Sequence, residues 1–152
     1  MSVSGGRNAR PRRILAVCLG NYCRSPLAAA VLTALAGAGV QVRSAGLRDK
    51  WAGQPASPLM LAAAAEVGFD LSAHVGAQVT VELIDWADTV LAMDRAVLAE
   101  LREFADERAA GKLRCYLPDA DVPDPFGQPL DMFRDCVILV REGAAQHLVG
   151  ER

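Results

Sequence analysis

The feature that most constrains this chain is the stretch Val17–Pro26, which reads VCLGNYCRSP. It combines a thiol, two residues typical of tight turns, a guanidinium and the start of a helix. The residues 13–17 that lead into Cys18 are apolar after Arg13, with the β-branched Ile14 and Val17 near the two ends, as in a buried strand. Ser25 is expected to cap the following helix and Pro26 to open it, where a missing N–H costs nothing. The stretch therefore predicts a strand, a tight loop and a helix in direct succession.

A loop between a strand and a helix N-terminus is suited to binding an anion. Its backbone N–H groups and the positive end of the helix dipole point toward one place. Cys18 opens the loop and Arg24 closes it, so the thiol and the guanidinium are expected to face one oxyanion. The helix terminus and the arginine both favour a thiolate. This predicts attack by sulfur on phosphorus, with Arg24 holding two phosphoryl oxygens and stabilising the charge of the transition state.

The sequence CLGNYCRSP resembles the active-site loop of the low-molecular-weight protein tyrosine phosphatase family, in which five residues separate a Cys from an Arg-Ser pair. The resemblance implies a phosphocysteine intermediate, a phosphotyrosyl protein or other aryl phosphate as substrate, inorganic phosphate as product, and no metal or other cofactor. A buried structural cysteine beside a surface arginine is the plainer alternative, but matching all these positions by chance is improbable. The residues expected to form the phosphate-binding loop are Leu19, Gly20, Asn21, Tyr22, Cys23 and Ser25.

Hydrolysis of a phosphate ester also needs a proton for the leaving oxygen. The family resemblance points to an Asp-Pro pair near the C-terminus, and Asp124-Pro125 stands in the expected loop. Asp124 would then act as general acid in the first step and as general base for the water that cleaves the thiophosphate. Asp121 is the alternative acid. The aspartates of this proline-rich segment could also be ordinary turn residues.

Two further residues match family positions that support the loop asparagine, which is Asn21 here. They are Ser44 in the sequence SAG and His74 in the sequence AHVGAQVT. Asn21 is expected to hold a left-handed backbone conformation, for which Asn is among the few suitable residues besides glycine. His74 could alternatively be an ordinary core or surface histidine. Ser25 is expected to hydrogen bond to the Cys18 sulfur and so favour the thiolate or the departing thiol.

Aromatic residues are candidates for the walls of a cleft that would hold an aryl group. Trp51 and Phe126 are expected there, together with Tyr22, although each could equally be ordinary packing. The chain departs from the family pattern at three places. Tyr22 replaces an aliphatic residue, Ala77 replaces an arginine, and Phe126-Gly127 replaces two consecutive aromatic residues. These differences affect the expected substrate more than the expected reaction.

The four cysteines are too sparse for a disulfide framework, and residues 1–13 have no apolar core typical of a secretory signal. A cytoplasmic location is therefore expected. Cys23 could trap an oxidised Cys18 as a disulfide. A zinc site is not expected, because Cys115 and Cys136 lack the close spacing of metal ligands and fall in expected core elements.

Alternating strand and helix segments predict an α/β fold of three layers, α/β/α, with a central four-stranded parallel sheet. The expected strands cover residues 13–17, 41–46, 89–93 and 113–117, and the last helix covers about 130–148. Thr80 is expected to cap a short helix, and Asp94 to start a helix that Gly111 ends. The phosphatase loop would lie between the first strand and the first helix, beyond the carboxyl end of the strand, where such sheets bind ligands. A length of 152 residues favours one domain over residues 12–152, after a disordered tail over residues 1–11.

Charge and hydropathy narrow the function further. A formal net charge of −2 argues against nucleic-acid binding, and no apolar run reaches membrane-spanning length. The expected function is a cysteine-dependent phosphomonoester phosphatase that hydrolyses aryl phosphates, above all protein phosphotyrosine. The alternatives are a phosphatase for a small-molecule phosphate ester, an arsenate reductase of the same fold, and a silent phosphate-binding module. An arsenate reductase needs two further shuttling cysteines on a mobile segment, and a silent module has no need of Asp124.

Overall fold

Four parallel strands in the order β2-β1-β3-β4 form the centre of the structure. The computed structural model describes residues 10–149. The central strand β1 (Arg12–Cys18) pairs along its whole length with β2 (Val40–Gly46) and, on its other side, with β3 (Thr89–Ala92). The edge strand β4 (Leu113–Cys115) pairs with β3. The predicted four-stranded parallel sheet is confirmed, with strand ends shifted by one or two residues.

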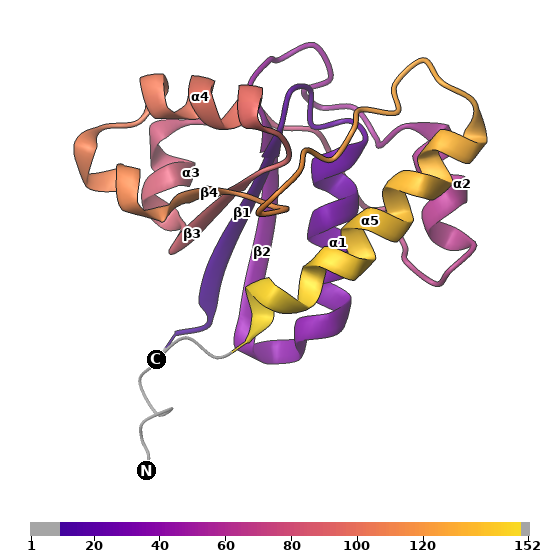
Figure 1. Cartoon of the computed structure of the whole chain (residues 1–152), viewed down its shortest axis with the longest axis horizontal. Helices are drawn as coiled ribbons and strands as arrows, with labels where there is room; N and C mark the ends of the chain where they lie inside the picture. The colour runs from indigo at the N-terminus through magenta and orange to yellow at the C-terminus, as the bar shows by residue number, and fades with distance from the viewer. Residues whose placement is uncertain (1–9, 150–152) are drawn as a thin grey trace.

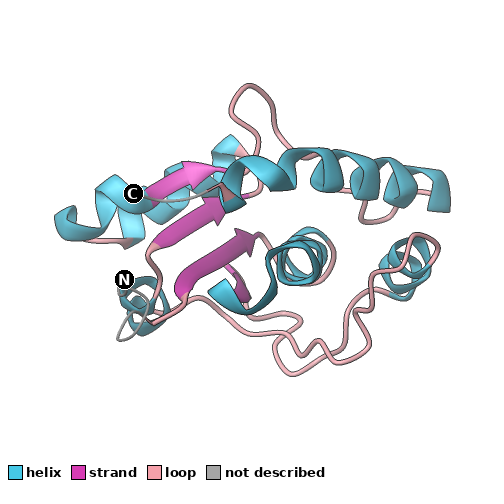
Figure 2. Cartoon of the chain, turned by 90° about the horizontal axis from the view of Figure 1, so that it is seen from below, coloured by secondary structure: helices cyan, strands magenta, loops and turns pink. Residues whose placement is uncertain are grey.

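Helices cover both faces of this sheet, as Figures 1 and 2 show. One face is covered by α1 (Arg24–Ala36), α2 (Pro58–Ala65) and α5 (Leu130–Leu148). The other face is covered by α3 (Val81–Trp86) and α4 (Arg95–Phe104), and the 3-10 helices are η2 (Gly37–Gly39) and η3 (Glu107–Lys112). The predicted three layers are therefore confirmed, and α5 has the predicted bounds. None of the helices within residues 10–149 is long and apolar enough to cross a membrane.

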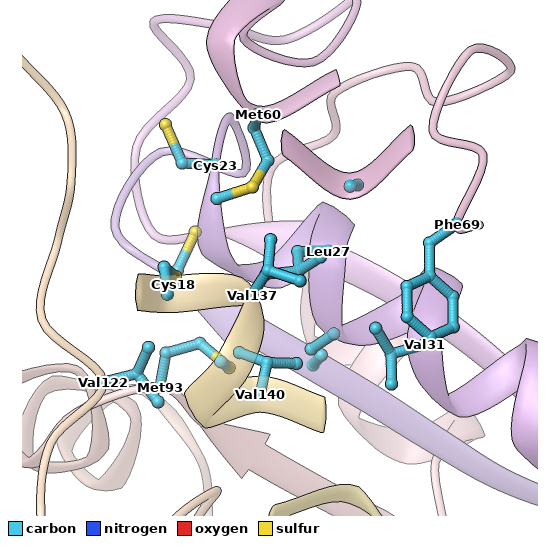
Figure 3. Packing of buried hydrophobic residues seen from close by; sticks show 14 of the residues in the cluster. Cys18, Cys23, Leu27, Val31, Met60, Phe69, Met93, Val122, Val137 and Val140 are labelled. Atoms are coloured by element: carbon cyan, nitrogen blue, oxygen red, sulfur yellow. The ribbon is translucent and has the colours of Figure 1, made fainter. Parts of the chain in front are cut away.

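Strand β1 contributes to two hydrophobic cores, because successive side chains of a strand point to opposite faces of the sheet. Ile14 and Ala16 pack on the side of α1, α2 and α5, whereas Leu15 and Val17 pack on the side of α3 and α4. All four side chains are fully buried. Figure 3 shows the first core, whose labelled residues include Leu27, Met60, Met93, Val137 and Val140. Burial on both faces anchors the strand that ends at Cys18.

Polar side chains set the start of three helices. Ser57 caps α2, Thr80 caps α3 and Asp94 caps α4, each accepting a hydrogen bond from the N–H three residues later. The predicted cap at Thr80 and the predicted helix start at Asp94 are confirmed. The predicted cap at Ser25 is wrong, because α1 already begins at Arg24 and its N-cap residue, Cys23, makes no side-chain cap bond. The Ser25 hydroxyl is bonded inside the preceding loop instead.

One other sequence expectation differs from the structure at the edge of the fold, and another falls mostly outside the described residues. The helix expected to run from Asp94 to Gly111 ends at Phe104, and the separate 3-10 helix η3 follows, with Asp106 as its cap. Most of the disordered tail expected over residues 1–11 lies outside the described residues. Arg10 is described, and its Nη1 lies 2.9 Å from Asp88 Oδ2. The Arg10 hydrogen bond lowers the pKa of Asp88.

The buried His147 makes the stability of the fold sensitive to pH. Its Nε2 donates to the Tyr116 carbonyl oxygen at 2.7 Å, and burial lowers its pKa. An unfolded histidine titrates near pH 6.5, so as pH falls the unfolded chain takes up this proton before the folded chain does. We therefore expect the free energy of unfolding to fall as the pH decreases from about 7 to about 5.

Urea unfolding of wild type and of a His147→Gln variant at several pH values measures this contribution. Glutamine keeps an N–H donor but does not titrate, so the variant should show a shallower pH dependence. A smaller slope should remain, because burial also lowers the pKa of His74. Equal slopes in the two proteins would contradict the assignment.

Candidate active site

The Cys18 sulfur lies at the end of β1, inside the loop that joins this strand to α1. Its Sγ accepts a hydrogen bond from the Asn21 backbone N–H at 3.2 Å and lies 3.0 Å from Ser25 Oγ. The sulfur is therefore held in place by contacts from within its own loop. Cys18 is buried, but it also lines the cavity above the loop, and Figure 3 shows it beside the first core.

Asn21 holds the shape of this loop. Its φ of 55° is the only positive φ at a non-glycine position within residues 10–149. The side-chain Nδ2 donates to Ser25 Oγ at 2.8 Å and to Ser44 Oγ at 3.0 Å. The Asn21 backbone oxygen accepts from His74 Nε2 at 3.0 Å. The structure thus places Ser44 and His74 directly against the residue that the sequence expected them to support.

The segment His74–Ala77 ties the loop to a second region. The Ala77 backbone N–H donates to Asn21 Oδ1 at 2.9 Å. Position 77 therefore supports the loop through its backbone and needs no arginine side chain to do so. One residue earlier, the Gly76 N–H donates to the Gln54 oxygen and the Gly76 oxygen accepts from the Gly53 N–H. A Cβ atom on Gly76 would lie 2.2 Å from the Trp51 oxygen. Glycine at position 76 therefore lets the segment that carries Trp51 approach closely.

Arg24 closes the loop with a buried guanidinium. Its Nη1 donates to Asp94 Oδ2 at 2.7 Å and to the Val122 oxygen at 2.9 Å, and Nη2 lies 3.8 Å from Asp124 Oδ2. Burial alone would lower the pKa of Arg24, but the Asp94 hydrogen bond and the nearby Cys18 and Asp124 charges raise it. The cation is therefore held in one orientation beside the thiol.

Sequence reasoning treated Asp94 only as the start of a helix. In the structure one of its oxygens caps α4 by accepting from the Val97 N–H at 2.7 Å, and the other binds Arg24. The sequence could have predicted that Asp94 lies near the site, because Asp94 almost directly follows β3, a strand that neighbours β1. Side chains at the carboxyl ends of neighbouring parallel strands meet at one edge of the sheet.

The two candidate acids lie in different surroundings. Asp124 lines the cavity, is 44% exposed, and accepts the Phe126 N–H at 3.1 Å. Asp121 instead accepts from the Arg95 backbone N–H at 3.0 Å and from Arg95 Nε at 3.1 Å, and these bonds lower its pKa. Asp121 does not line the cavity. The geometry therefore favours Asp124 over Asp121.

A cavity of about 410 Å3 opens above the loop. Three aromatic rings form one of its sides. Tyr22 and Trp51 stack with ring centroids 3.9 Å apart, and Phe126 lies 6.0 Å from Tyr22 and 6.1 Å from Trp51. The cavity is also lined by three consecutive charged residues that sequence reasoning did not single out, namely Arg48, Asp49 and Lys50. Because they directly precede Trp51, which was expected to line the cleft, the sequence could have placed them at the cavity as well.

The four cysteines are all free. Burial raises the pKa of Cys23 to about 12, with a further increase from the Asp124 charge. Burial likewise raises the pKa of Cys136 to about 12. Few such thiols ionise near neutral pH, which slows disulfide exchange through Cys23. The redox role of Cys23 stays a prediction. Within the described part of the chain, no group of three or more His, Cys, Asp or Glu side chains is placed to hold a metal ion.

This fold and this site define a class of protein. A parallel α/β sheet presents a thiol, a buried arginine and the Asn21 N–H donor at the carboxyl end of its first strand, as a cysteine-dependent phosphatase requires. The family described as low molecular weight phosphotyrosine protein phosphatase matches residues 13–151. The chain belongs to this family, of which cysteine-dependent phosphatase activity is typical.

Individual relatives agree with this assignment. The chain is 37% identical over 154 residues to a low molecular weight protein-tyrosine-phosphatase of Streptomyces coelicolor, covering 92% of this chain and 93% of the relative. It is 39% identical over 128 residues to a protein-arginine-phosphatase of Geobacillus stearothermophilus, covering 82% and 85%. Among solved structures, Vibrio vulnificus Wzb in complex with benzylphosphonate superposes with a TM-score of 0.85 at 30% identity, covering 90% and 97%.

Asp94 should be required to orient Arg24. Asparagine remains a good helix cap but loses the charge that fixes the guanidinium, so Asp94→Asn should lower kcat for p-nitrophenyl phosphate by roughly 10²-fold while α4 stays folded. The matched control is Asp121→Asn, which removes a carboxylate at the same end of α4 but outside the cavity. A wild-type kcat in Asp94→Asn would contradict this role.

Gly76 should matter for substrate binding through the Trp51 segment. In Gly76→Ala the new Cβ displaces the backbone at Trp51, so KM for p-nitrophenyl phosphate should rise roughly tenfold, by more than kcat falls. Gly111→Ala serves as the control, because a Cβ there meets nothing within 4 Å. Steady-state kinetics would refute the prediction if kcat fell with no change in KM.

Proposed function

We propose that this chain hydrolyses phosphotyrosyl proteins through a phosphocysteine at Cys18 and releases inorganic phosphate. The observation that carries the proposal is the position of the Cys18 sulfur. It lies at the foot of an aromatic-sided cavity, hydrogen bonded to a loop N–H, with the buried Arg24 and the exposed Asp124 lining the same cavity. These are the nucleophile, the stabilising cation and the proton donor that the reaction needs.

The first step transfers the phosphoryl group to the protein. The Cys18 thiolate attacks phosphorus, the S–P bond forms and the bond from phosphorus to the aryl oxygen breaks. Arg24 and the N–H groups of the loop stabilise the charge on the phosphoryl oxygens. Asp124, the carboxyl group that lines the cavity near Arg24, donates its proton to the departing oxygen.

The second step regenerates the thiolate. Asp124, now ionised, accepts a proton from a water molecule whose oxygen attacks phosphorus, and the S–P bond breaks. The departing sulfur accepts hydrogen bonds from the Asn21 backbone N–H and from the Ser25 hydroxyl. The Asn21 nitrogen lies 3.2 Å and Ser25 Oγ 3.0 Å from Cys18 Sγ. Inorganic phosphate leaves the loop, and no metal or cofactor is required for either step.

The side of the cavity supports an aryl phosphate as substrate. The rings of Tyr22, Trp51 and Phe126 offer apolar faces on which a tyrosyl ring can pack. Phosphoarginine is the competing substrate, because one of the relatives is a protein-arginine-phosphatase. An arsenate reductase is disfavoured, since Cys115 lies in β4 and Cys136 is buried in α5 rather than on a mobile segment.

The location that suits this chemistry is the cytoplasm. A catalytic thiolate requires a reducing environment, and cytoplasmic proteins rarely contain disulfides. Four free cysteines are consistent with such a compartment.

The proposal is tested by comparing two leaving groups. Cys18→Ser should abolish turnover of every substrate. Asp124→Asn should lower kcat/KM, which reports the first step, by 10²-fold or more for a phosphotyrosyl peptide, whose phenolate leaves poorly without a proton, and by much less for p-nitrophenyl phosphate. Equal losses for the two substrates would contradict the role of Asp124, and retained turnover in Cys18→Ser would contradict the whole mechanism.

The choice of substrate is decided by matched peptides. Wild-type protein should release phosphate from a phosphotyrosyl peptide with a kcat/KM well above that for phosphoseryl and phosphoarginyl peptides of otherwise equal sequence. A higher kcat/KM for the phosphoarginyl peptide would assign the chain to that substrate instead.

A further inference from the structure

Lys50 places a positive charge at the aromatic side of the cavity. Its Nζ lies 5.0 Å from the ring centroid of Trp51 and 5.9 Å from that of Phe126. Both distances are within the range of cation–π attraction, which holds the ammonium over two rings that line the site. The backbone just before it is also fixed, because the N–H groups of Leu47 and Arg48 donate to the oxygens of Cys18 and Leu19.

The other cations that line the cavity already have carboxylate partners. Arg24 binds Asp94, and Arg48 binds Glu100 through both of its terminal nitrogens. Lys50 has no ion pair with any carboxylate in the described part of the chain, and it is exposed. The ammonium therefore keeps all three donors available for an anion that arrives from solution.

We propose that Lys50 recognises a carboxylate on the substrate beside the phosphorylated residue, so that acidic phosphotyrosyl sequences are preferred. This inference rests on the proposed function. A tyrosyl ring packed on Trp51 and Phe126 brings the peptide backbone to the mouth of the cavity, where Lys50 lies. Neighbouring residues of an extended peptide are about 3.3 Å apart along the chain, so an Asp or Glu adjacent to the phosphotyrosine comes within reach of a flexible lysine.

The remaining charges of the cavity make Lys50 necessary for this preference. Asp49 and Asp124 also line the cavity and would repel an acidic peptide. Arg24 and Arg48 each already face a carboxylate of the chain. Lys50 is thus the cation of the cavity lining that can offset this repulsion.

The test uses two phosphotyrosyl peptides that differ only in having Glu or Gln on both sides of the phosphotyrosine. Wild type should hydrolyse the Glu peptide with a kcat/KM about three- to fivefold higher, as expected for one partly exposed ion pair, and mainly through a lower KM. In Lys50→Gln this ratio should fall to one or below. Raising the salt concentration should reduce the wild-type ratio, because salt screens exposed charges.

The chain offers a matched control, since its only other lysine is Lys112. Lys112 Nζ donates to the Ala87 oxygen, and Lys112 lies outside the cavity lining, so Lys112→Gln changes the net charge equally but should keep the wild-type ratio. An equal preference in wild type, or an undiminished one in Lys50→Gln, overturns the inference while leaving the proposed function intact. Failure of wild type to hydrolyse either peptide overturns both.

Discussion

The site depends on one strained turn of the backbone. Asn21 holds a left-handed conformation that most side chains resist, and the fold stabilises it by satisfying its side chain and its backbone oxygen. This turn directs the Asn21 N–H at the Cys18 sulfur. The strained conformation is stabilised by hydrogen bonds with two regions, namely Ser44 in β2 and His74 and Ala77 in the segment before α3. The loop is therefore preorganised, and its donors need little rearrangement when an oxyanion arrives.

Sheet order decides which residues reach this loop. Parallel strands end at one edge, and the order β2-β1-β3-β4 places the segments after β2 and β3 on the two sides of the loop that follows β1. Gly46, at the end of β2, lies so close that a Cβ there would be 2.7 Å from the Asn21 nitrogen. Asp94, after β3, reaches Arg24 from the other side. The site is thus assembled by the sheet rather than by the loop alone.

Buried charge explains why Arg24 is held so firmly. Taking a guanidinium out of water is costly unless carboxylates and hydrogen bonds compensate for the lost hydration. Asp94 and the Val122 oxygen supply that compensation on one side of the guanidinium. Cys18 and Asp124 add negative charge on the side of the cavity. This arrangement keeps the cation beside the sulfur and ties the segment that contains Val122, and with it the acid-bearing loop, to the phosphate loop.

The sequence by itself determined the strand-loop-helix around Cys18, the parallel α/β class, most helix and strand positions, and the left-handed Asn21. These follow from local patterns, namely hydrophobic periodicity, turn residues and one dense motif, whose physics acts over a few residues. Tertiary structure alone decided that Ser25 does not cap α1, that the guanidinium of Arg24 binds Asp94, and that Asp121 is bound by Arg95 outside the cavity. It also decided that Lys50 lies over Trp51 and Phe126. Each of these contacts depends on the order of the strands in the sheet or on the path of a folded loop. Local residue spacing in the sequence predicts neither of the two.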